Sequence, residues 1–314
     1  MTQTPKVSVS FITYNQNRYV TEAIESVLMQ RTDFRYEFVI SDDFSTDGTR
    51  EVCRTYQSRY PDRIRLIERE KNIGAVANYL ETFKACRGEY VAYLEGDDCW
   101  IHPEKLQRQV DFLDTHPDFA ICCHNVSVMD ENGINSGNLL DGTKEVTDVT
   151  ELCRGDYIST PSCMVRNGLL NEIPSWLYSL PGCDWAFDIL NAEKGKIRFF
   201  PEVLAAYRVH AAGIWSGHSA ETRHRMALDI ISILNEKLEY KYDSSFETYR
   251  FRLLHAISSQ AHDELQIKHE VLKSEYDRLN TKFQATIESL AHLQEERTRP
   301  WFQRLKGWIK ASMK

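Results

Sequence analysis

Residues 36–48 read Tyr-Glu-Phe-Val-Ile-Ser-Asp-Asp-Phe-Ser-Thr-Asp-Gly, an apolar run that stops abruptly in a polar turn. The aromatic and β-branched residues at its start predict a strand, and the apolar spacing over 49–60 predicts a helix after the turn. Residues 90–98, Tyr-Val-Ala-Tyr-Leu-Glu-Gly-Asp-Asp, repeat the plan of an apolar strand that ends in two aspartates. The chain therefore has two predicted strands that both end in paired carboxylates.

The flanking segments extend this plan. Strands are predicted at 7–12 and 64–67, and helices at 19–30 and 75–86, from their β-branched content and apolar spacing. An alternation of strands and helices is typical of a parallel sheet wrapped by helices. We therefore expect an α/β fold with a mostly parallel, Rossmann-like sheet.

Four aspartates fall where such sheets bind ligands, beyond the carboxyl ends of the strands. Asp42 and Asp43 follow the second strand, and Asp97 and Asp98 follow the fourth. Adjacent carboxylates raise each other's pKa unless a cation or hydrogen-bond donors compensate. A divalent ion would compensate Asp97 and Asp98, or one of them caps the next helix. Asp43 either accepts the imide N–H of uracil or thymine, or belongs to a turn.

The second half of the chain is predicted to complete the sheet and then to become helical. The expected elements are a helix from Pro103 to about His116, strands at 119–128, 161–165, 199–201 and 203–210, and a helix at 184–192. From Ala220 the chain is predicted to be helical almost to its end. The expected domains are a globular domain at 1–218, a helical connector at 219–258, a coiled coil at 259–298 and a basic amphipathic tail at 299–314.

The composition argues against several classes of protein. A formal net charge of −8 over 314 residues argues against nucleic acid as a partner, since phosphate binding needs a concentrated basic face. No run approaches the roughly 20 apolar residues that cross a bilayer, and the N-terminus lacks the apolar core of a signal peptide. The eight cysteines form no CxxC pair, which favours reduced thiols over a zinc site. We therefore expect a cytoplasmic protein.

Four motifs occur in order along the chain. They are Val-Ser-Phe-Ile-Thr-Tyr-Asn at 9–15, Asp-Asp-Phe-Ser-Thr-Asp-Gly-Thr at 42–49, Asn-Ile-Gly at 72–74 and Glu-Gly-Asp-Asp at 95–98. Together they resemble the family 2 glycosyltransferases with the GT-A fold, and the resemblance covers roughly residues 5–216. It implies an enzyme that transfers a sugar from a nucleoside diphosphate donor with inversion at the anomeric carbon.

The resemblance also implies roles for individual residues. Those expected to bind the donor are Thr13, Tyr14, Asn15, Asp43, Asn72, Asp97 and Arg208. Within this set, Tyr14 would lie against the base and Asp43 would bond a pyrimidine, so UDP or dTDP is favoured over GDP. Asp97 would lie near the ribose and diphosphate, while the role of Glu95 stays open.

A divalent metal, Mn²⁺ or Mg²⁺, is implied as the cofactor, with Asp98 as a direct ligand and His210 as a second candidate. The metal would stabilise the negative charge of the leaving diphosphate. Inversion needs a base for the acceptor hydroxyl, and Asp184 matches that position. Many relatives carry Glu-Asp where this chain has Cys183-Asp184, so the base is kept and its neighbour changed. Without the resemblance, Asp184 is a candidate helix cap.

The acceptor is expected to be a glycan or a lipid-linked sugar. The Gln-x-x-Arg-Trp signature of processive, membrane-embedded relatives is absent from the sequence, which favours addition of one sugar per encounter. The loop at 132–148 is expected to border the acceptor site. A nucleotidyltransferase is disfavoured because the turn after the first strand has neither glycine nor lysine. The remaining alternative is a non-catalytic scaffold that binds sugar nucleotides.

The C-terminal segment carries a heptad pattern. One seam consists of Leu265, Leu272, Leu279, Thr286 and Leu293, and the second of Tyr276, Phe283 and Leu290. This spacing predicts a coiled coil and a homo-oligomer, and the alternative is a helix folded back on the globular domain.

The last residues alternate apolar and basic side chains at helical spacing. The apolar set is Trp301, Phe302, Leu305, Trp308, Ile309 and Met313, and the basic set is Arg304, Lys306, Lys310 and Lys314. This pattern favours a helix that lies on an anionic membrane surface, which would hold the enzyme at the inner face of the cytoplasmic membrane. A packing helix is the alternative.

Overall fold

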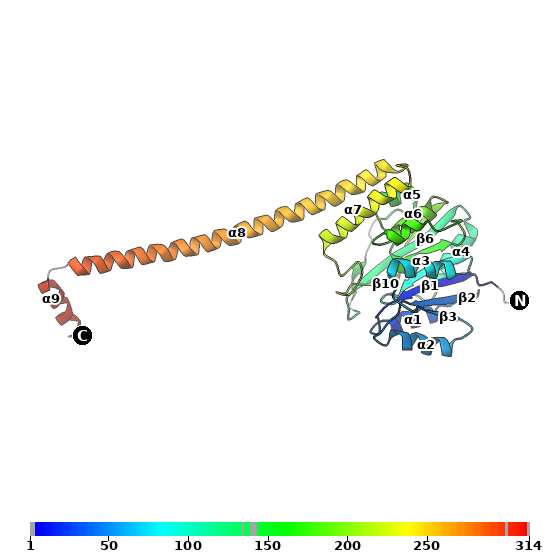
Figure 1. Cartoon of the computed structure of the whole chain (residues 1–314), viewed down its shortest axis with the longest axis horizontal. Helices are drawn as coiled ribbons and strands as arrows, with labels where there is room; N and C mark the ends of the chain where they lie inside the picture. The colour runs from blue at the N-terminus through cyan, green and yellow to red at the C-terminus, as the bar shows by residue number, and fades with distance from the viewer. Residues whose placement is uncertain (1–3, 134, 139–142, 299–300, 313–314) are drawn as a thin grey trace. The chain divides into compact units, whose positions relative to one another are not determined.

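The computed structural model describes residues 4–133, 135–138, 143–298 and 301–312. The chain divides into two compact units, Met1–Leu254 and His255–Lys314, which are treated separately below. The first unit contains the whole sheet and its covering helices, and the second contains most of helix α8 and helix α9 (Figure 1).

The strands of the first unit are β1 Val7–Thr13, β2 Tyr36–Asp42, β3 Ile64–Glu68, β4 Tyr90–Glu95, β5 Cys99–Trp100, β6 Phe119–Met129, β7 Asn135–Asn138, β8 Val146–Thr147, β9 Met164–Arg166 and β10 Lys196–Arg208. The helices of the chain are α1 Val20–Leu28, α2 Thr49–Arg59, α3 Ala75–Ala85, α4 Lys105–Thr115, α5 Val149–Cys153, α6 Asp184–Ala192, α7 Ala220–Lys237, α8 Asp243–Thr298 and α9 Trp301–Ala311, with 3₁₀ turns η1 at Thr160–Ser162 and η2 at Ser175–Ser179.

The strands form one mixed sheet in the order β3-β2-β1-β4-β9-β6-β10-β5, with β7 paired to β6 and β8 to β10. The four strands β3, β2, β1 and β4 are parallel, as the alternation of strands and helices predicts. The short strand β9 is antiparallel to both β4 and β6, whereas β6 and β10 are parallel to each other. The carboxyl ends of β1, β2 and β4 therefore lie side by side at one edge of the sheet.

Helices cover both faces of the sheet. The core on one face contains apolar side chains of α1, α2 and α4, and the core on the other face contains those of α3, α5, α6 and α7. Strand β1 is buried along its full length because its alternate side chains enter the two cores. Figure 1 shows the sheet between these two helical layers.

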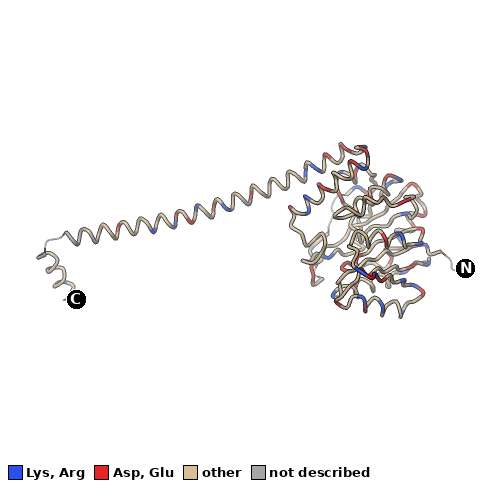
Figure 2. Tube along the Cα trace, viewed as in Figure 1, with Lys and Arg blue, Asp and Glu red and all other residues tan. Residues whose placement is uncertain are grey.

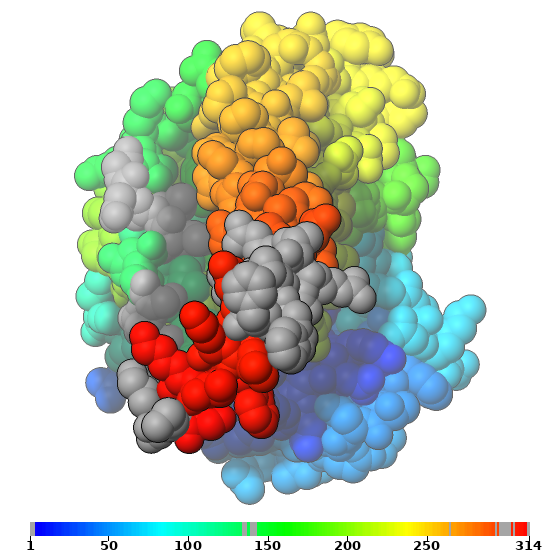
Figure 3. Space-filling model, turned by 90° about the vertical axis from the view of Figure 1, so that its left-hand side faces the viewer, coloured from blue at the N-terminus to red at the C-terminus, as the bar shows by residue number. Residues whose placement is uncertain are grey.

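The segment predicted as a connector, 219–258, contributes to the core of the first unit. Helix α7 buries Ile231 and Leu234 there, and the first turns of α8 add Phe246 and Leu253. The space-filling view shows this segment in yellow against the green part of the unit (Figure 3). The predicted continuous helix from Ala220 is interrupted between α7 and α8, where Glu239 and Tyr240 have positive φ angles of 51° and 59°.

The two strands predicted at 199–201 and 203–210 form one strand, β10, which ends at Arg208. Its pairing with β6 shifts register between Phe200 and Val203. Pro201 lies in this irregular stretch, and because proline has no N–H to donate to a ladder it is tolerated at a bulge. None of the helices that the structure describes is both long and apolar enough to span a bilayer.

Candidate active site

Strand register brings the first and second motifs together. Thr13, the last residue of β1, pairs with Asp42, the last residue of β2. The backbone N–H of Asp43 then donates to the carbonyl oxygen of Thr13 at 3.0 Å. The residues that follow both strands therefore start from neighbouring positions at the edge of the sheet.

Hydrogen bonds join the two loops after these strands. Asn15 has a positive φ of 52°, a conformation that asparagine tolerates better than most residues. Its backbone N–H donates to Oγ of Ser45 at 2.9 Å, and its Oδ1 accepts from the backbone N–H of Thr46 at 2.9 Å. The backbone N–H of Asn17 donates to Oδ2 of Asp47 at 3.0 Å. Asn15 thus joins the loops, while the neighbouring Tyr14 is 46% exposed and has its ring available to a ligand.

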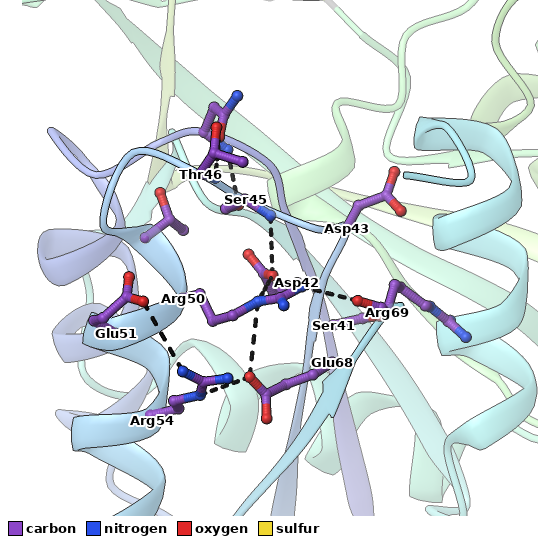
Figure 4. A network of polar contacts seen from close by, with 12 residues as sticks. Ser41, Asp42, Asp43, Ser45, Thr46, Arg50, Glu51, Arg54, Glu68 and Arg69 are labelled. Atoms are coloured by element: carbon purple, nitrogen blue, oxygen red, sulfur yellow. Dashed lines mark hydrogen bonds and ion pairs between the residues drawn. The ribbon is translucent and has the colours of Figure 1, made fainter. Parts of the chain in front are cut away.

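The adjacent aspartates Asp42 and Asp43 face different partners, as Figure 4 shows. The carboxylate of Asp42 accepts from Nε of Arg50 at 2.7 Å and from the backbone N–H of Ser45 at 3.1 Å. The carboxylate of Asp43 accepts from the backbone N–H groups of Ile73 and Gly74 at 2.8 and 2.9 Å. Asp42 therefore belongs to the charged network beneath the loop, and Asp43 joins the second motif to the third.

Asn72 takes part in the same turn. Its Oδ1 accepts from the backbone N–H of Gly74 at 3.0 Å, and Gly74 has a positive φ of 88°. Glycine suits this backbone because it has no Cβ to clash. Asn72 and Asp43 together fix the turn that precedes helix α3.

Three carboxylates gather after β4, and we call Glu95, Asp97 and Asp98 the carboxylate cluster. Their ligand oxygens lie within 4.8 Å of one another. Burial raises the pKa of Glu95 to about 8, and the nearby carboxylates of Asp97 and Asp184 raise it as well. Burial also raises the pKa of Asp98 well above its usual range, followed by the charges of Asp97 and Glu95. A cation in the cluster would relieve this repulsion.

The arginine expected at the diphosphate, Arg208, is buried and makes its contacts within the protein. Its backbone N–H donates to Oδ1 of Asp98 at 2.8 Å, and its Nε donates to the carbonyl of Asp97 at 2.8 Å. One Nη donates to Oε2 of Glu22 at 2.6 Å, and the other to the carbonyl of Asp130 at 3.3 Å. Arg208 therefore supports the loop that carries Asp97 and Asp98.

His210 lies beside the carboxylate cluster. Its Nε2 is 2.9 Å from Oδ2 of Asp97, and its ring is 5.1 Å from the ring of Tyr19. The Tyr19 ring also lies 4.7 Å from the guanidinium of Arg208. These contacts fix the imidazole in an orientation that points a ring nitrogen at Asp97.

The cluster has the donor set of a site for a hard divalent cation. Carboxylate oxygens with an imidazole nitrogen suit Mn²⁺, and carboxylates suit Mg²⁺. Asp98 Oδ2 is a buried oxygen with no hydrogen-bond partner among the described residues. The side chain of Asp97 is 15% exposed, whereas Asp98 is 2% exposed. Asp97 is thus the more exposed of the two aspartates, and Asp98 offers the unpartnered oxygen.

Asp184 begins helix α6, where the helix dipole favours a negative charge. Its Oδ2 accepts from Oγ1 of Thr160 at 3.4 Å. The charge of Asp184 contributes to the raised pKa of Glu95, so the carboxylate lies within electrostatic reach of the cluster. Asp184 and Glu95 are therefore near each other in the fold, although they lie far apart in the sequence.

Sequence reasoning missed Glu22 and Tyr19, which hold Arg208 from helix α1 and the turn before it. Both residues lie in a segment whose apolar spacing predicted only a helix. Glu22 is an acidic residue in the first turn of α1, a common position for surface carboxylates, so the sequence carried no signal for its partner.

Comparisons with known proteins agree with this geometry. Residues 8–173 match the family described as Glycosyl transferase family 2. An uncharacterized protein of Mycobacterium tuberculosis is 39% identical over 222 residues, which cover 70% of this chain and 62% of that protein. EpsE of Bacillus subtilis, a proposed glycosyltransferase, is 34% identical over 189 residues, which cover 56% of this chain and 67% of EpsE. The matched region thus spans less than two thirds of the mycobacterial relative.

Solved structures share the fold. A structure of Staphylococcus aureus TarS with UDP-GlcNAc superposes with a TM-score of 0.59 at 21% identity and covers 78% of this chain and 71% of that one. The mannosyltransferase PcManGT of Pyrobaculum calidifontis, with GDP-Man and Mn²⁺, gives a TM-score of 0.54 at 18% identity and covers 86% and 81% of the two chains.

The fold and the acidic strand ends define a GT-A glycosyltransferase domain, as the motifs predict. The chain belongs to glycosyl transferase family 2. Its sequence Glu95-Gly-Asp-Asp98 fits the DXD-like motif of such enzymes. The three carboxylates of the cluster form a group that could hold a divalent cation.

Proposed function

We propose that the protein transfers one sugar from a UDP- or dTDP-sugar to a glycan or lipid-linked acceptor, with inversion at the anomeric carbon. The observation that carries this proposal is the convergence of three acidic groups at one edge of the sheet. Asp43 follows β2, the carboxylate cluster follows β4, and Asp184 lies within electrostatic reach of that cluster. Nucleotide, metal and base sites at one edge are what the transfer reaction needs.

The donor base would bind beside Asp43. The carboxylate already accepts two backbone N–H groups and retains lone pairs for the imide N–H of a pyrimidine. The exposed Tyr14 ring supplies a face on which the base can stack. TarS was crystallised with UDP-GlcNAc and PcManGT with GDP-Man, so the fold accommodates more than one base, and Asp43 favours the pyrimidine.

The metal ligands are proposed to be Asp98 and His210, as the sequence predicts, with Asp97 beside them. Oδ1 of Asp98 accepts from the backbone N–H of Arg208, whereas its Oδ2 has no hydrogen-bond partner among the described residues and is available to an ion. The thermal unfolding experiment described below distinguishes Mn²⁺ from Mg²⁺. When bound, a divalent cation supplies electrostatic stabilisation of the departing nucleoside diphosphate. Arg208 is proposed as a positioning residue that holds both aspartates.

Asp184 is proposed as the general base. In a single displacement, the acceptor oxygen forms a bond to the anomeric carbon while the bond from that carbon to the diphosphate oxygen breaks. The acceptor hydroxyl proton goes to the Asp184 carboxylate, and the electron pair leaves with the diphosphate.

The proposal is tested by binding and turnover measured together. Thermal unfolding with UDP, dTDP and GDP, with and without Mn²⁺ or Mg²⁺, should show a metal-dependent stabilisation of about 2.7 kcal/mol at 100 times the dissociation constant. Asp184→Asn should keep that shift and lower release of UDP from a reactive UDP-sugar by about 10²–10⁴-fold. A nucleotide shift without any turnover would support the non-catalytic scaffold, and no shift with any nucleotide would contradict the proposal. Equal turnover by Asp184→Asn would remove this residue as the base.

The C-terminal tail is proposed to contact a membrane, which would bring the enzyme to a lipid-linked acceptor in surface-polysaccharide synthesis. Within α9, Leu305, Trp308 and Ile309 are exposed, with Trp308 at 74%. Met313, Lys314 and the side chains of Trp301, Phe302 and Arg304 lie outside the described residues. The full chain should bind vesicles with 30% phosphatidylglycerol more tightly than a Trp308→Glu variant does. Equal binding by the two proteins would contradict a membrane contact.

A further inference from the structure

Helix α8 carries an apolar stripe that has no partner within the described part of the second unit. The stripe consists of the exposed side chains of Leu265 (67%), Leu272 (64%), Tyr276 (68%), Leu279 (65%), Phe283 (63%) and Leu290 (59%), while the exposed Ile267, Val271 and Ile287 of the same segment lie outside it. These residues occupy the two seams of the heptad pattern, so they share one face of the helix. An apolar face that is this exposed in a single chain indicates an interaction site.

The heptad positions follow from the spacing of the two seams. Residues of the leucine seam at 265, 272, 279 and 286 take position d, and residues at 269, 276, 283 and 290, four positions later, take position a. Position a is therefore His269 in the first repeat, and position d is Thr286 in the fourth. The stripe thus has one polar core residue near each end and apolar residues between.

We propose that α8 pairs with the α8 helix of a second copy of this chain in an antiparallel two-stranded coiled coil. The two helices cross between residues 277 and 278, so that Tyr276 of each copy faces Leu279 of the other. The neighbouring layers then pair Leu272 with Phe283 and Leu265 with Leu290 across the interface. All six exposed apolar side chains of the stripe are covered by this arrangement.

The first argument for this register is the pairing of the two polar core residues, His269 and Thr286. The antiparallel register places His269 of one copy opposite Thr286 of the other. The Thr286 hydroxyl already donates to the carbonyl oxygen of Lys282 at 2.9 Å, so its oxygen is left to accept from an imidazole N–H. A parallel pair would instead stack His269 on His269 and Thr286 on Thr286, without this complementarity.

The second argument is charge. The flanking g positions include Lys268, Glu275 and Lys282, and position e includes Lys273. Figure 2 shows charges of both signs along α8. In the proposed register, Glu275 of each copy faces Lys282 of the other, which gives two attractive pairs. In a parallel pair, Lys268 of one helix faces Lys273 of the other, which gives two repulsive pairs.

Other antiparallel registers are less favourable. A shift of one heptad in one direction places Glu275 opposite Glu275 and Lys268 opposite Lys282. A shift in the other direction places Lys282 opposite Lys282. Like charges across an interface act against the wrong register. Within the residues that the structure describes, no ion pair inside the chain engages Glu275 or Lys282, so both are available to a second copy.

Charge reversal in the full chain tests the pairing. Sedimentation equilibrium should give a dimer whose dissociation constant rises about tenfold in Glu275→Lys and in Lys282→Glu, because each change creates two like-charge pairs. The double variant Glu275→Lys/Lys282→Glu should recover the dimer, since it only exchanges the two signs. Additive weakening in the double variant would overturn the proposal, and so would a monomeric or trimeric wild-type chain.

Distances between identical positions test the orientation. All eight native cysteines are buried, so one introduced thiol can be spin-labelled selectively. At 1.5 Å rise per residue, labels on Glu288→Cys should be separated by about 32 Å along the axis of an antiparallel pair, whereas in a parallel pair the two labels have no separation along the axis. Labels on Ser274→Cys, near the crossing point, should be about 10 Å apart along the axis. Short distances at both positions would indicate a parallel coiled coil and overturn the proposal.

Discussion

Nε2 of His210 lies 2.9 Å from Oδ2 of Asp97, although 113 positions separate the two residues. The contact joins the segment that follows β10 to the segment that follows β4, beside the carboxylate cluster. Asp98, next to Asp97 in the chain, is instead turned toward the backbone N–H of Arg208. Because the two aspartates have different partners, substitutions at the two positions should have different effects.

The first prediction concerns metal binding. Asp98→Asn and His210→Ala should each raise the dissociation constant for Mn²⁺ in the presence of UDP by at least about tenfold, because each changes a proposed ligand. Asp97→Asn keeps an oxygen for the contact with His210 and should change that constant less. Titration calorimetry of the three variants measures the effect. If Asp97→Asn is the most damaging variant, the direct contact belongs to Asp97.

The second prediction concerns Gly96, whose backbone packs against the first motif. A Cβ at this position would lie 2.4 Å from Oε1 of Gln16 and 2.6 Å from Oγ1 of Thr13, which are themselves hydrogen-bonded at 2.8 Å. Gly96→Ala should therefore destabilise the fold by about 1–3 kcal/mol and weaken nucleotide binding. Gly307→Ala is the matched control, since nothing lies within 4 Å of the position that a Cβ would take there. Denaturant unfolding of both variants checks the difference, and equal stability would contradict the packing.

The third prediction separates Asp42 from Asp43. Asp42 is buried and ion-paired with Arg50 at 2.7 Å, so Asp42→Asn leaves that arginine with the more distant carboxylate of Glu68 at 3.7 Å and should cost about 2 kcal/mol of stability. Asp43→Asn should cost about 1 kcal/mol through its turn, and it should abolish the preference for UDP over GDP. Unfolding and nucleotide titration of both variants measure this split. The reverse pattern would exchange the two roles.

The fourth prediction concerns Lys105, a buried lysine at the start of α4. Its Nζ has no hydrogen-bond partner among the described residues and lies 4.0 Å from the centre of the Trp100 ring. Burial lowers its pKa from 10.5 to about 7. The unfolded chain therefore binds more protons between these values, so the contribution of Lys105 to stability improves as pH rises from about 7 to about 10.5.

It follows that Lys105→Met should stabilise the protein most at pH 6, by on the order of 3 kcal/mol, and much less at pH 10. Exposed Lys194→Met serves as the control and should show no such dependence on pH. Denaturant unfolding at the two pH values is the measurement. A destabilised Lys105→Met at pH 6 would mean that the charged amine is compensated in the folded protein.

Much of the fold could be predicted from local patterns. The β-branched runs and apolar spacings predicted β1 to β4 and α1 to α4, and the helix at 184–192 matches α6. These signals succeed because each depends on residues a few positions apart. The outcome differs in β10, where the bulge at Pro201 joins two predicted strands into one, because pairing with β6 outweighs the local break.

The site could be predicted less completely. The motifs placed Asp43, Asp97 and Asp98 at strand ends, since parallel strands end at one edge. The contact of Arg208 with Glu22 spans 186 positions, and no periodicity encodes such a pair. The charge of Arg208 suits a phosphate, whereas its burial and its partners are set by how three elements pack together.

Asn15 donates its backbone N–H to Ser45 and accepts from the backbone N–H of Thr46, so protein atoms alone join the two loops. The wall that would receive the nucleotide is therefore held together by contacts in which the donor takes no part. Binding need not order these loops, so little conformational entropy is lost there and association is not delayed by their folding. The rate at which the donor binds should then depend on diffusion and charge, and donors that differ only in their sugar should associate at similar rates.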